Sequence, residues 1–346
     1  MGIYRFLLAY CVVIEHLSGN RYLSHTGMFA VFGFYVLSGY LITRVLNDIY
    51  GFRADLFWLN RFLRLFPPYA VFLIIGLVFV FGTSSAAEFF PAVWKAHPTF
   101  ADWVGVIAVF PMGVSPMEWH FRPVPSIWSV GVELLNYAAL FVVVARSRHL
   151  ALLVALGALS YHVVGIWRGD SLADRYFPFY AALLPFALGS LIYFYTRASR
   201  RISPRGALML CMPAALNCLV AGLLGGVQDS PLFEALFYLN LVFQCLAVWA
   251  LSVMTPTPYR AIDKWIGDLS YPVFLCHWQV GYVLSVLFFP TRSVGLGLMF
   301  AALVGSVAVA YVVTRCQDMI VEPLRSRIRS KGPSILYAPN AGIAGT

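Results

Sequence analysis

The chain has 346 residues, of which 60% are apolar and only 11% are charged. A soluble domain cannot bury so much apolar surface, and runs near the roughly 20 residues that a helix needs to cross a bilayer recur along the sequence. The formal net charge of +9 would suit nucleic acid, but the basic residues fall in short segments between apolar runs. Composition therefore excludes a soluble protein and a nucleic-acid partner, and predicts an all-α integral membrane protein surrounded by lipid.

Ten apolar runs are long enough to span a membrane, and arginines mark alternate connections between them. The basic connections lie near residues 44–64, 146–148 and 197–205, with two predicted spans between each and the next. By the positive-inside rule these connections are cytoplasmic. We therefore predict a bundle of about ten transmembrane helices with both termini cytoplasmic. The predicted spans are residues 3–19, 28–45, 67–82, 126–145, 150–167, 177–196, 206–226, 232–254, 266–289 and 294–316.

A further apolar run, residues 104–113, is too short to cross the hydrocarbon. Counting it as a span would place the later arginine clusters outside, so we interpret it as a re-entrant or interfacial segment. Residues 83–125 then form the longest outer segment. No repeat or second domain is apparent, so residues 1–330 are predicted to form one transmembrane domain and residues 331–346 a short, disordered cytoplasmic tail.

The six cysteines show no metal-type spacing, and most lie within apolar runs, where they behave as small hydrophobic residues. We infer neither disulfides nor a metal site. Cys276 stands beside His277, but adjacent residues on a helix point in different directions, which argues against a nucleophile paired with that histidine.

Ionisable side chains within the predicted spans are few, and the cost of each in hydrocarbon makes it a functional candidate. Arg5 lies at the inner interface, and His16, eleven residues further along, lies about 16 Å away in the outer half. Glu133 lies seven residues beyond Ser126, where its helix enters from outside, and so about 10 Å below the outer surface. These counts place His16 and Glu133 at a shared depth, where they could meet. His277 lies near the midplane.

A histidine held by a carboxylate is the pair that a general base requires, because the carboxylate fixes the tautomer and stabilises the imidazolium. The alternative for any one of these residues is a structural hydrogen bond to a neighbouring helix. The arginines Arg44, Arg61 and Arg64 have a comparable alternative, since they could serve only to set the topology.

Five short motifs follow one another from residue 5 to residue 323. In order they are Arg5 with ten residues to His16, residues 33–42 (GFYVLSGYLI), residues 61–69 (RFLRLFPPY), Trp128 and Ser129 followed by Glu133, and residues 267–277 (GDLSYPVFLCH) with Glu322 and Pro323 beyond them. Together they resemble the signature of the acyltransferase 3 family, membrane-bound O-acyltransferases that include bacterial O-antigen and exopolysaccharide O-acetylases. Each motif alone is weak, but the five in this order are a specific match.

The resemblance implies a fold of roughly ten helices with cytoplasmic termini, in a bacterial inner membrane. It also implies transfer of an acyl group, usually acetyl from acetyl-CoA, to a hydroxyl of a glycan or lipid-linked glycan on or beyond the outer face. The acyl-CoA is then a substrate, and no permanently bound cofactor is expected. Two departures, Glu15 where an apolar residue is usual and Asn136 where an aromatic often stands, could tune the site or its acceptor.

Many members carry a soluble hydrolase-like domain after the helices. None follows here, so the membrane domain is expected to work alone or with a partner, and the sequence leaves the oligomeric state open.

The donor side of such a site is expected at the inner face. Guanidinium groups suit the phosphates of CoA, and Arg5, Arg44, Arg61 and Arg64 all lie near that face. Arg61 and Arg64 are three residues apart and share one helical face if that segment is helical. The acyl arm would then run up through the bundle toward His16.

The chemical step is expected to depend on His16, which would take the proton of the acceptor hydroxyl as that hydroxyl attacks the thioester. Glu133 would orient His16 or the sugar, and His277 or Ser270 could polarise the thioester carbonyl. The motifs supply the remaining site candidates, Trp128, Ser129, Tyr271 and Glu322.

Three alternatives stay open. A covalent acyl-histidine is the competing chemical route. A proton-coupled transporter or flippase would also use many spans with buried His and Glu, but no paired Gly- or Pro-interrupted spans occur in matching halves. A structural scaffold would leave the shared depth of His16 and Glu133 unexplained.

Overall fold

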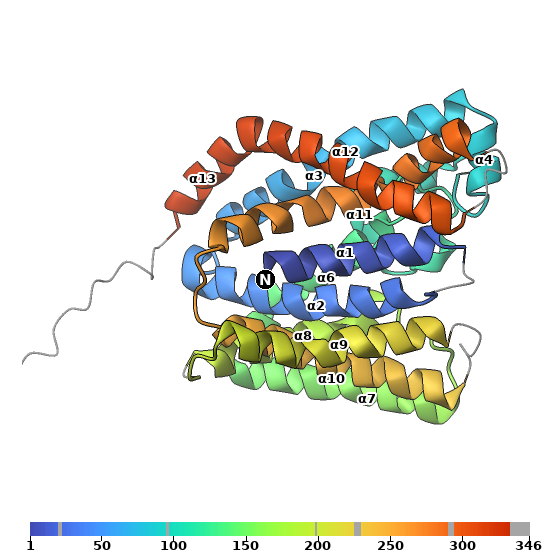
Figure 1. The fold of residues 1–346 in the computed structure, drawn as a ribbon. Helices are drawn as coiled ribbons and strands as arrows, with labels where there is room; N and C mark the ends of the chain where they lie inside the picture. Colours follow the sequence, from blue (N-terminus) through green and yellow to red (C-terminus); the bar gives the residue numbers. More distant parts are fainter. Residues whose placement is uncertain (20–22, 95–96, 198, 225–229, 290–293, 333–346) are drawn as a thin grey trace, which may run out of the picture.

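The computed structural model describes residues 1–19, 23–94, 97–197, 199–224, 230–289 and 294–332, which are mostly helical (Figure 1). Within these residues, extended pairing is limited to two isolated bridges, Trp94 with Phe121 and Ile202 with Met254. The α-helices are α1 (Gly2–Leu17), α2 (Thr26–Val45), α3 (Ala54–Gly82), α4 (Ser85–Phe89), α5 (Phe100–Ala108), α6 (Ile127–Val142), α7 (Arg148–Arg168), α8 (Phe179–Thr196), α9 (Pro204–Leu223), α10 (Pro231–Val253), α11 (Arg260–Phe288), α12 (Leu296–Ile320) and α13 (Glu322–Ser330). The 3-10 or π segments are η1 (Leu46–Tyr50), η2 (Phe110–Gly113), η3 (Pro116–Glu118) and η4 (Val144–Arg146).

Eight helices of the described chain are long and apolar enough to cross a membrane, namely α2, α3 and α7 to α12. The prediction of an all-α membrane protein is confirmed at that level. The other two predicted spans are also helical, but α1 and α6 have 16 residues each, about 24 Å, which is less than the roughly 30 Å of hydrocarbon. Ten crossings and cytoplasmic termini therefore stay predictions.

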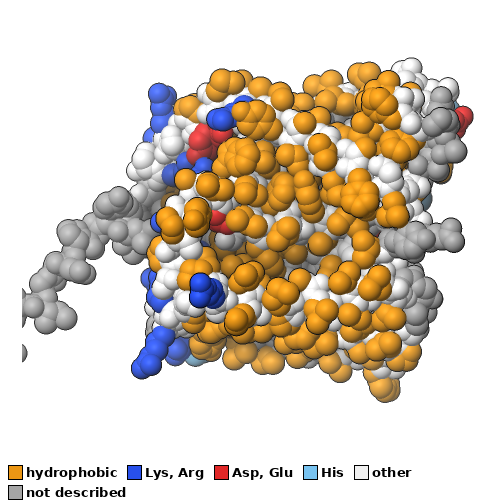
Figure 2. Space-filling view, in the orientation of Figure 1, with side chains coloured by type: hydrophobic (Ala, Val, Ile, Leu, Met, Phe, Trp, Pro, Cys, Tyr) orange, Lys and Arg blue, Asp and Glu red, His pale blue; other side chains and the backbone are white. Residues whose placement is uncertain are grey.

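The long helices lie side by side with roughly parallel axes (Figure 1). α1 packs against α2 and α11, and α12 and α3 pack on α11. α7 to α10 form a second group, joined to the rest through α2 and, at α8, through α6. The start of α1 and all of α13 lie at one end of the bundle (Figure 1). Lys and Arg side chains gather there on the visible face, while hydrophobic side chains cover the middle (Figure 2). We call this the basic end and the opposite one the outer end.

α2 and α8 pack closely because each presents a glycine to the backbone of the other. A Cβ atom on Gly39 would lie 2.1 Å from the carbonyl oxygen of Phe186, and one on Gly189 would lie 2.1 Å from that of Val36. Such contacts between small residues are how helices associate in lipid, where the hydrophobic effect does not drive helices together. The second helical group is therefore held to the first at a spacing that admits no side chain at these positions.

The described residues of the segment 83–125, which are 83–94 and 97–125, pack on the start of α6 and on α3, and are called here the layer of residues 83–125. It contains α4, α5 and η2, with a turn at Val109 (φ 63°) between the last two. η2 packs on α6 so closely that a Cβ on Gly113 would lie 2.5 Å from the carbonyl carbon of Gly131. The hydroxyl of Tyr69 on α3 donates to the carbonyl of Val106 in α5 (2.6 Å). The start of α6 is therefore covered by residues of this layer.

α13 closes the basic end beneath α3, where the side-chain amide of Asn60 donates to the carbonyl of Arg325 (3.3 Å). Lys331 and Gly332 follow it. The predicted disordered tail, residues 331–346, lies outside the described residues from position 333 onward, and the predicted domain limits stay predictions.

The glycine contacts predict opposite effects for two similar substitutions. Gly39→Ala should lower the melting temperature of the protein in detergent micelles, since the added methyl meets backbone and overpacking costs roughly 1–3 kcal/mol. Gly157→Ala on α7 is the matched control, because a Cβ there meets nothing within 4 Å. It should leave the melting temperature unchanged or raise it, because Ala favours helix over Gly. Equal melting temperatures for the two variants would contradict the packing account.

Candidate active site

Asp263 fixes how α1 lies against α11. Its carboxylate accepts hydrogen bonds from the backbone amides of Gly2 (2.9 Å) and Ile3 (2.9 Å), which the first turn of α1 would otherwise leave unpaired. A Cβ on Gly267, one turn further along α11, would lie 2.5 Å from the Cα of Gly2, so the helices approach closely there. With this end fixed, the later turns of α1 run beside α11.

His16, in the last turn of α1, contacts His277 of α11. Nδ1 of His16 lies 2.8 Å from Nε2 of His277, and the stacked rings have centroids 5.1 Å apart. Nδ1 of His277 lies 2.8 Å from the carbonyl oxygen of Phe274. His277 is completely buried, whereas His16 is partly exposed and lines a cavity at the outer end.

The hydrogen-bond partners assign the ring protons of the two neutral histidines. A carbonyl oxygen only accepts, so Nδ1 of His277 carries a proton and its Nε2 is an acceptor. Nδ1 of His16 then donates to that acceptor, which leaves Nε2 of His16 unprotonated. Among the described residues, none makes a hydrogen bond to this Nε2. The pair thus leaves His16 with a basic nitrogen free for a molecule in the cavity.

Glu133 does not meet His16, so that predicted pair is wrong. Its two carboxylate oxygens accept from the hydroxyls of Ser38 (3.0 Å) and Tyr137 (3.0 Å). The depth count took Ser126 to lie at the outer surface, but Ser126 is only 2% exposed, beneath the layer formed by residues 83–125. Because α6 begins below that layer, Glu133 lies deeper than counted and shares a cavity with arginines from the basic end.

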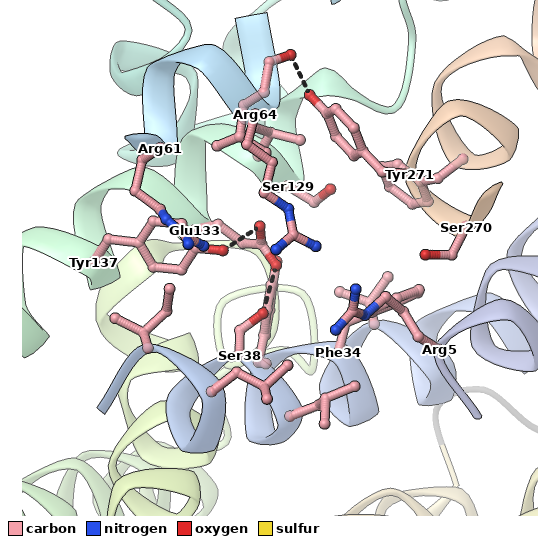
Figure 3. Close-up of a pocket in the computed structure, with 18 residues that line it drawn as sticks. Arg5, Phe34, Ser38, Arg61, Arg64, Ser129, Glu133, Tyr137, Ser270 and Tyr271 are labelled. Carbon is pink, nitrogen blue, oxygen red and sulfur yellow. Dashed lines mark hydrogen bonds between the residues drawn. The ribbon is translucent and has the colours of Figure 1, made fainter. Parts of the chain in front are cut away.

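This central cavity contains Glu133 and three arginines (Figure 3). Arg5 comes from α1, and Arg61 and Arg64 come from consecutive turns of α3, with the charged ends of all three side chains directed into the cavity (Figure 3). Three positive charges face one negative charge, so the cavity carries a surplus that suits a phosphate-bearing ligand. The other predicted site residues that line it are Ser129, Ser270 and Tyr271.

Arg44 does not join these three arginines. It lies at the end of α2, exposed to solvent, with its Nε 3.8 Å from the carboxylate of Asp48. Leu37 and Leu41, on the same face of α2, line the central cavity, but Arg44 lies one turn further on, at the end of the helix, and does not line it. The structure therefore supports a topological role for Arg44 more than a ligand-binding one.

Glu322 lies at the start of α13 and forms ion pairs with Arg325 (2.7 Å) and with Arg329. It lines a second cavity, the basic cavity, at the basic end of the bundle. This cavity shares the side chains of Arg5, Arg64 and Tyr271 with the central cavity, so the two spaces adjoin.

The outer cavity, on the other side of the central one, is the space that His16 lines. It shares Val31 and Phe274 with the central cavity, so these two side chains separate the spaces. The three cavities therefore form a row from the basic end to the outer end. Besides His16, the outer cavity is lined by Glu15, Arg122, Phe90, Trp128, Tyr176 and Trp278.

Phe274 contributes to the site through its backbone and its side chain. Its carbonyl oxygen accepts from Nδ1 of His277 and also from the hydroxyl of Ser126 (2.9 Å), at the start of α6. Its ring lies near that of Phe34, with centroids 6.2 Å apart, at the boundary between central and outer cavities. Phe274 thus sets the tautomer of the histidine pair and also separates the central cavity from the outer cavity.

Glu15 has a structural partner. One of its carboxylate oxygens accepts from the amides of Gly27 (2.6 Å) and Met28 (3.1 Å), at the start of α2. A carboxylate at a helix N-terminus satisfies unpaired N–H groups and complements the helix dipole. The departure from the family pattern at this position therefore joins α1 to α2 beside the outer cavity.

Four residues of this arrangement were missed by sequence reasoning. Tyr137 stands four residues after Glu133, a helical spacing that could have revealed it, and Ser38 belongs to a motif already singled out. Phe274 lies in the last of the five motifs, but neither it nor Ser126 gave a signal of their contact, which joins positions 148 residues apart.

Neither metal ligands nor a paired cysteine appear at the site. In the described part of the chain, no three His, Cys, Asp or Glu side chains gather as metal ligands would. The thiol of Cys276 is directed to the carbonyls of Val273 (3.8 Å) and Ser306 (3.7 Å), away from its neighbour His277.

A family model described as an acyltransferase domain matches residues 3–315, which is most of the chain. The chain belongs to the acyltransferase 3 family. The match includes α1 to α11 and most of α12, and hence both histidines and all three cavity arginines. No curated protein and no solved structure matches the chain detectably. Membership in the acyltransferase 3 family, together with the apolar helices, supports a multi-pass membrane acyltransferase.

The charge balance of the central cavity makes a prediction about stability. Glu133→Ala should lower the melting temperature strongly, because removing one partner of a buried charge cluster costs roughly 3–5 kcal/mol. Tyr137→Phe should cost only the roughly 1 kcal/mol of one hydrogen bond. The matched control is Asp55→Ala, which removes an exposed carboxylate 2.7 Å from Arg53 and should change little. A loss for Asp55→Ala as large as that for Glu133→Ala would contradict the account.

Proposed function

We propose that this protein transfers an acyl group, acetyl in the first instance, from cytoplasmic acyl-CoA to a hydroxyl of a cell-envelope or exported glycan, in the inner membrane. Family membership supports the reaction class. The observation that carries the rest is the row of three cavities, with arginines toward the basic end and a free histidine nitrogen at the outer cavity. Such a row lets a donor and an acceptor approach one another from opposite ends of the bundle.

The donor occupies the basic and central cavities. Arg5 and Arg64 line both cavities, and Arg61 lines the central one. Their guanidinium groups are therefore placed to bind the phosphates of CoA. Glu133, whose carboxylate is held by Ser38 and Tyr137, offsets part of the arginine charge rather than orienting His16. The acyl arm then extends toward Phe274 and the outer cavity.

His16 acts as the general base. Its Nε2 takes the proton of the acceptor hydroxyl, the hydroxyl oxygen bonds to the acyl carbon, and the carbon–sulfur bond breaks. The CoA thiolate leaves toward the central cavity and takes the proton that His16 accepted, which restores the neutral histidine. His277 keeps the reactive nitrogen of His16 unprotonated in the resting state and strengthens its hydrogen bond as the imidazolium forms. A covalent acyl-histidine on Nε2 is the competing route, and the same nitrogen would carry it.

The proposal predicts that His16→Ala abolishes transfer. Membranes containing wild-type protein or the variant, at matched expression, would receive acetyl-CoA labelled in the acetyl group, and label in cell-envelope glycan would be counted. Loss of a general base should lower transfer by about 10²-fold or more. His149→Ala is the matched control, since this histidine is exposed at the start of α7, outside the cavities.

Wild-type transfer by His16→Ala would remove the histidine from the mechanism. Wild-type membranes that transfer nothing from acetyl-CoA or a panel of other acyl-CoAs would instead favour the transporter or flippase, for which substrate flux is the assay.

His277 makes a second, separable prediction. Since it acts through His16 and lines neither the central nor the basic cavity, His277→Ala should lower kcat by about 10- to 100-fold while leaving KM for acetyl-CoA near the wild-type value. Cys276→Ala is the control on the same turn of α11 and should retain wild-type kcat. A His277→Ala variant altered mainly in KM for acetyl-CoA would place this residue in donor binding.

A further inference from the structure

The outer cavity has a lining typical of sugar-binding sites, with one unusual member. Aromatic side chains, among them Phe90, Trp128 and Trp278, offer apolar faces and edges. The rings of Phe90 and Trp278 are stacked with centroids 3.9 Å apart, and Trp278 lies 5.1 Å from His16 by the same measure. The unusual member is Arg122, a cation contributed by the layer that covers α6.

The backbone around Arg122 is fixed on both sides. Its own amide donates to the carbonyl of Val93 (3.0 Å), and the carbonyl of the next residue, Pro123, accepts from the side-chain amide of Gln279 (3.0 Å) on α11. Phe121, just before it, is buried and bridged to Trp94. The backbone that carries the Arg122 side chain is thus held in place by contacts that do not involve its guanidinium group.

That guanidinium group has no partner in the described part of the chain. Its Nε is buried without a hydrogen bond, and no described carboxylate forms an ion pair with it. Glu15, which lines the same cavity, is engaged by the amides of Gly27 and Met28. Burial lowers the pKa of Arg122 to about 10, so it still carries its charge at neutral pH. A desolvated charge without a counter-ion is costly, and an anionic ligand would remove that cost.

We propose that Arg122 binds an anionic group of the acceptor, so that the preferred acceptor is an acidic sugar or a sugar phosphate. The inference rests on the proposed function and names the acceptor class for the same site. Arg122 and His16 line the same cavity, so one acceptor can contact both. The planar guanidinium fork matches a carboxylate or a phosphate, and the aromatic walls contact the sugar ring. Binding of the anion by Arg122 positions a neighbouring hydroxyl at Nε2 of His16.

The test uses the purified full chain in lipid nanodiscs, labelled acetyl-CoA and a crude envelope glycan as acceptor. Three probes compete for the transfer: methyl glucoside, which is neutral, methyl glucuronide and glucose 1-phosphate. For wild type, at least one anionic probe should inhibit at a concentration about tenfold or more below that of the neutral one, as expected for a charge-assisted hydrogen bond. Comparison of the two anions tells carboxylate from phosphate recognition.

The variants test whether Arg122 is the source of that preference. Arg122→Gln should bring the neutral-to-anionic ratio of inhibition constants close to 1, Arg122→Lys should give an intermediate ratio, and Arg148→Gln, an exposed arginine at the start of α7, should leave it unchanged. If Arg122→Gln does not fold, the ratio for Arg122→Lys decides, and a wild-type ratio there overturns the proposal.

The opposing outcomes are distinct. A wild-type ratio near 1 overturns the proposal, and so does an Arg122→Gln variant that transfers less label with an unchanged ratio, because that result assigns Arg122 to the reacting oxygen or to the fold. Wild-type protein that labels no glycan overturns the proposed function first, and this inference with it.

Discussion

The carbonyl oxygen of Phe274 is the acceptor on which the candidate site depends. A carbonyl has two lone pairs, and this one receives both the Nδ1 proton of His277 and the hydroxyl proton of Ser126. The first bond sets the tautomers of both histidines, and the second joins the start of α6 to α11. The Phe274 side chain separates the central and outer cavities. One short stretch of α11 therefore fixes the start of α6, sets the protonation of both histidines and separates the central cavity from the outer one.

The polar groups inside the bundle face cavities that two short helices help to form. α1 and α6, with 16 residues each, are too short to reach both membrane surfaces unaided, and the layer of residues 83–125 covers the outer end of α6. The last turn of α1 carries His16 into the outer cavity, and Glu133 faces the arginines in the central cavity. Charged side chains thus face cavities or one another and avoid lipid, where each would cost several kcal/mol.

The sequence was sufficient for the class of fold, the family and most of the residues that line the cavities, because apolar runs, arginine placement and local motifs are short-range signals. The sequence was insufficient for predicting which of these side chains contact one another. The depth of Glu133 depended on where α6 begins, which a layer made by residues 83–125 decides. The bond between His16 and His277 joins positions 261 residues apart. Packing between distant helices set each of these contacts.

The partition at Phe274 also bears on why such a site would transfer an acyl group rather than hydrolyse it. A thioester that reaches His16 from the central cavity must pass the side chains of Val31 and Phe274, which are shared by both cavities. A pantetheine arm filling that passage would itself exclude water from the central side, while a bound sugar would exclude it from the outer side. The attacking oxygen would then be the one that the acceptor places at Nε2 of His16, since effective concentration favours a positioned hydroxyl over solvent.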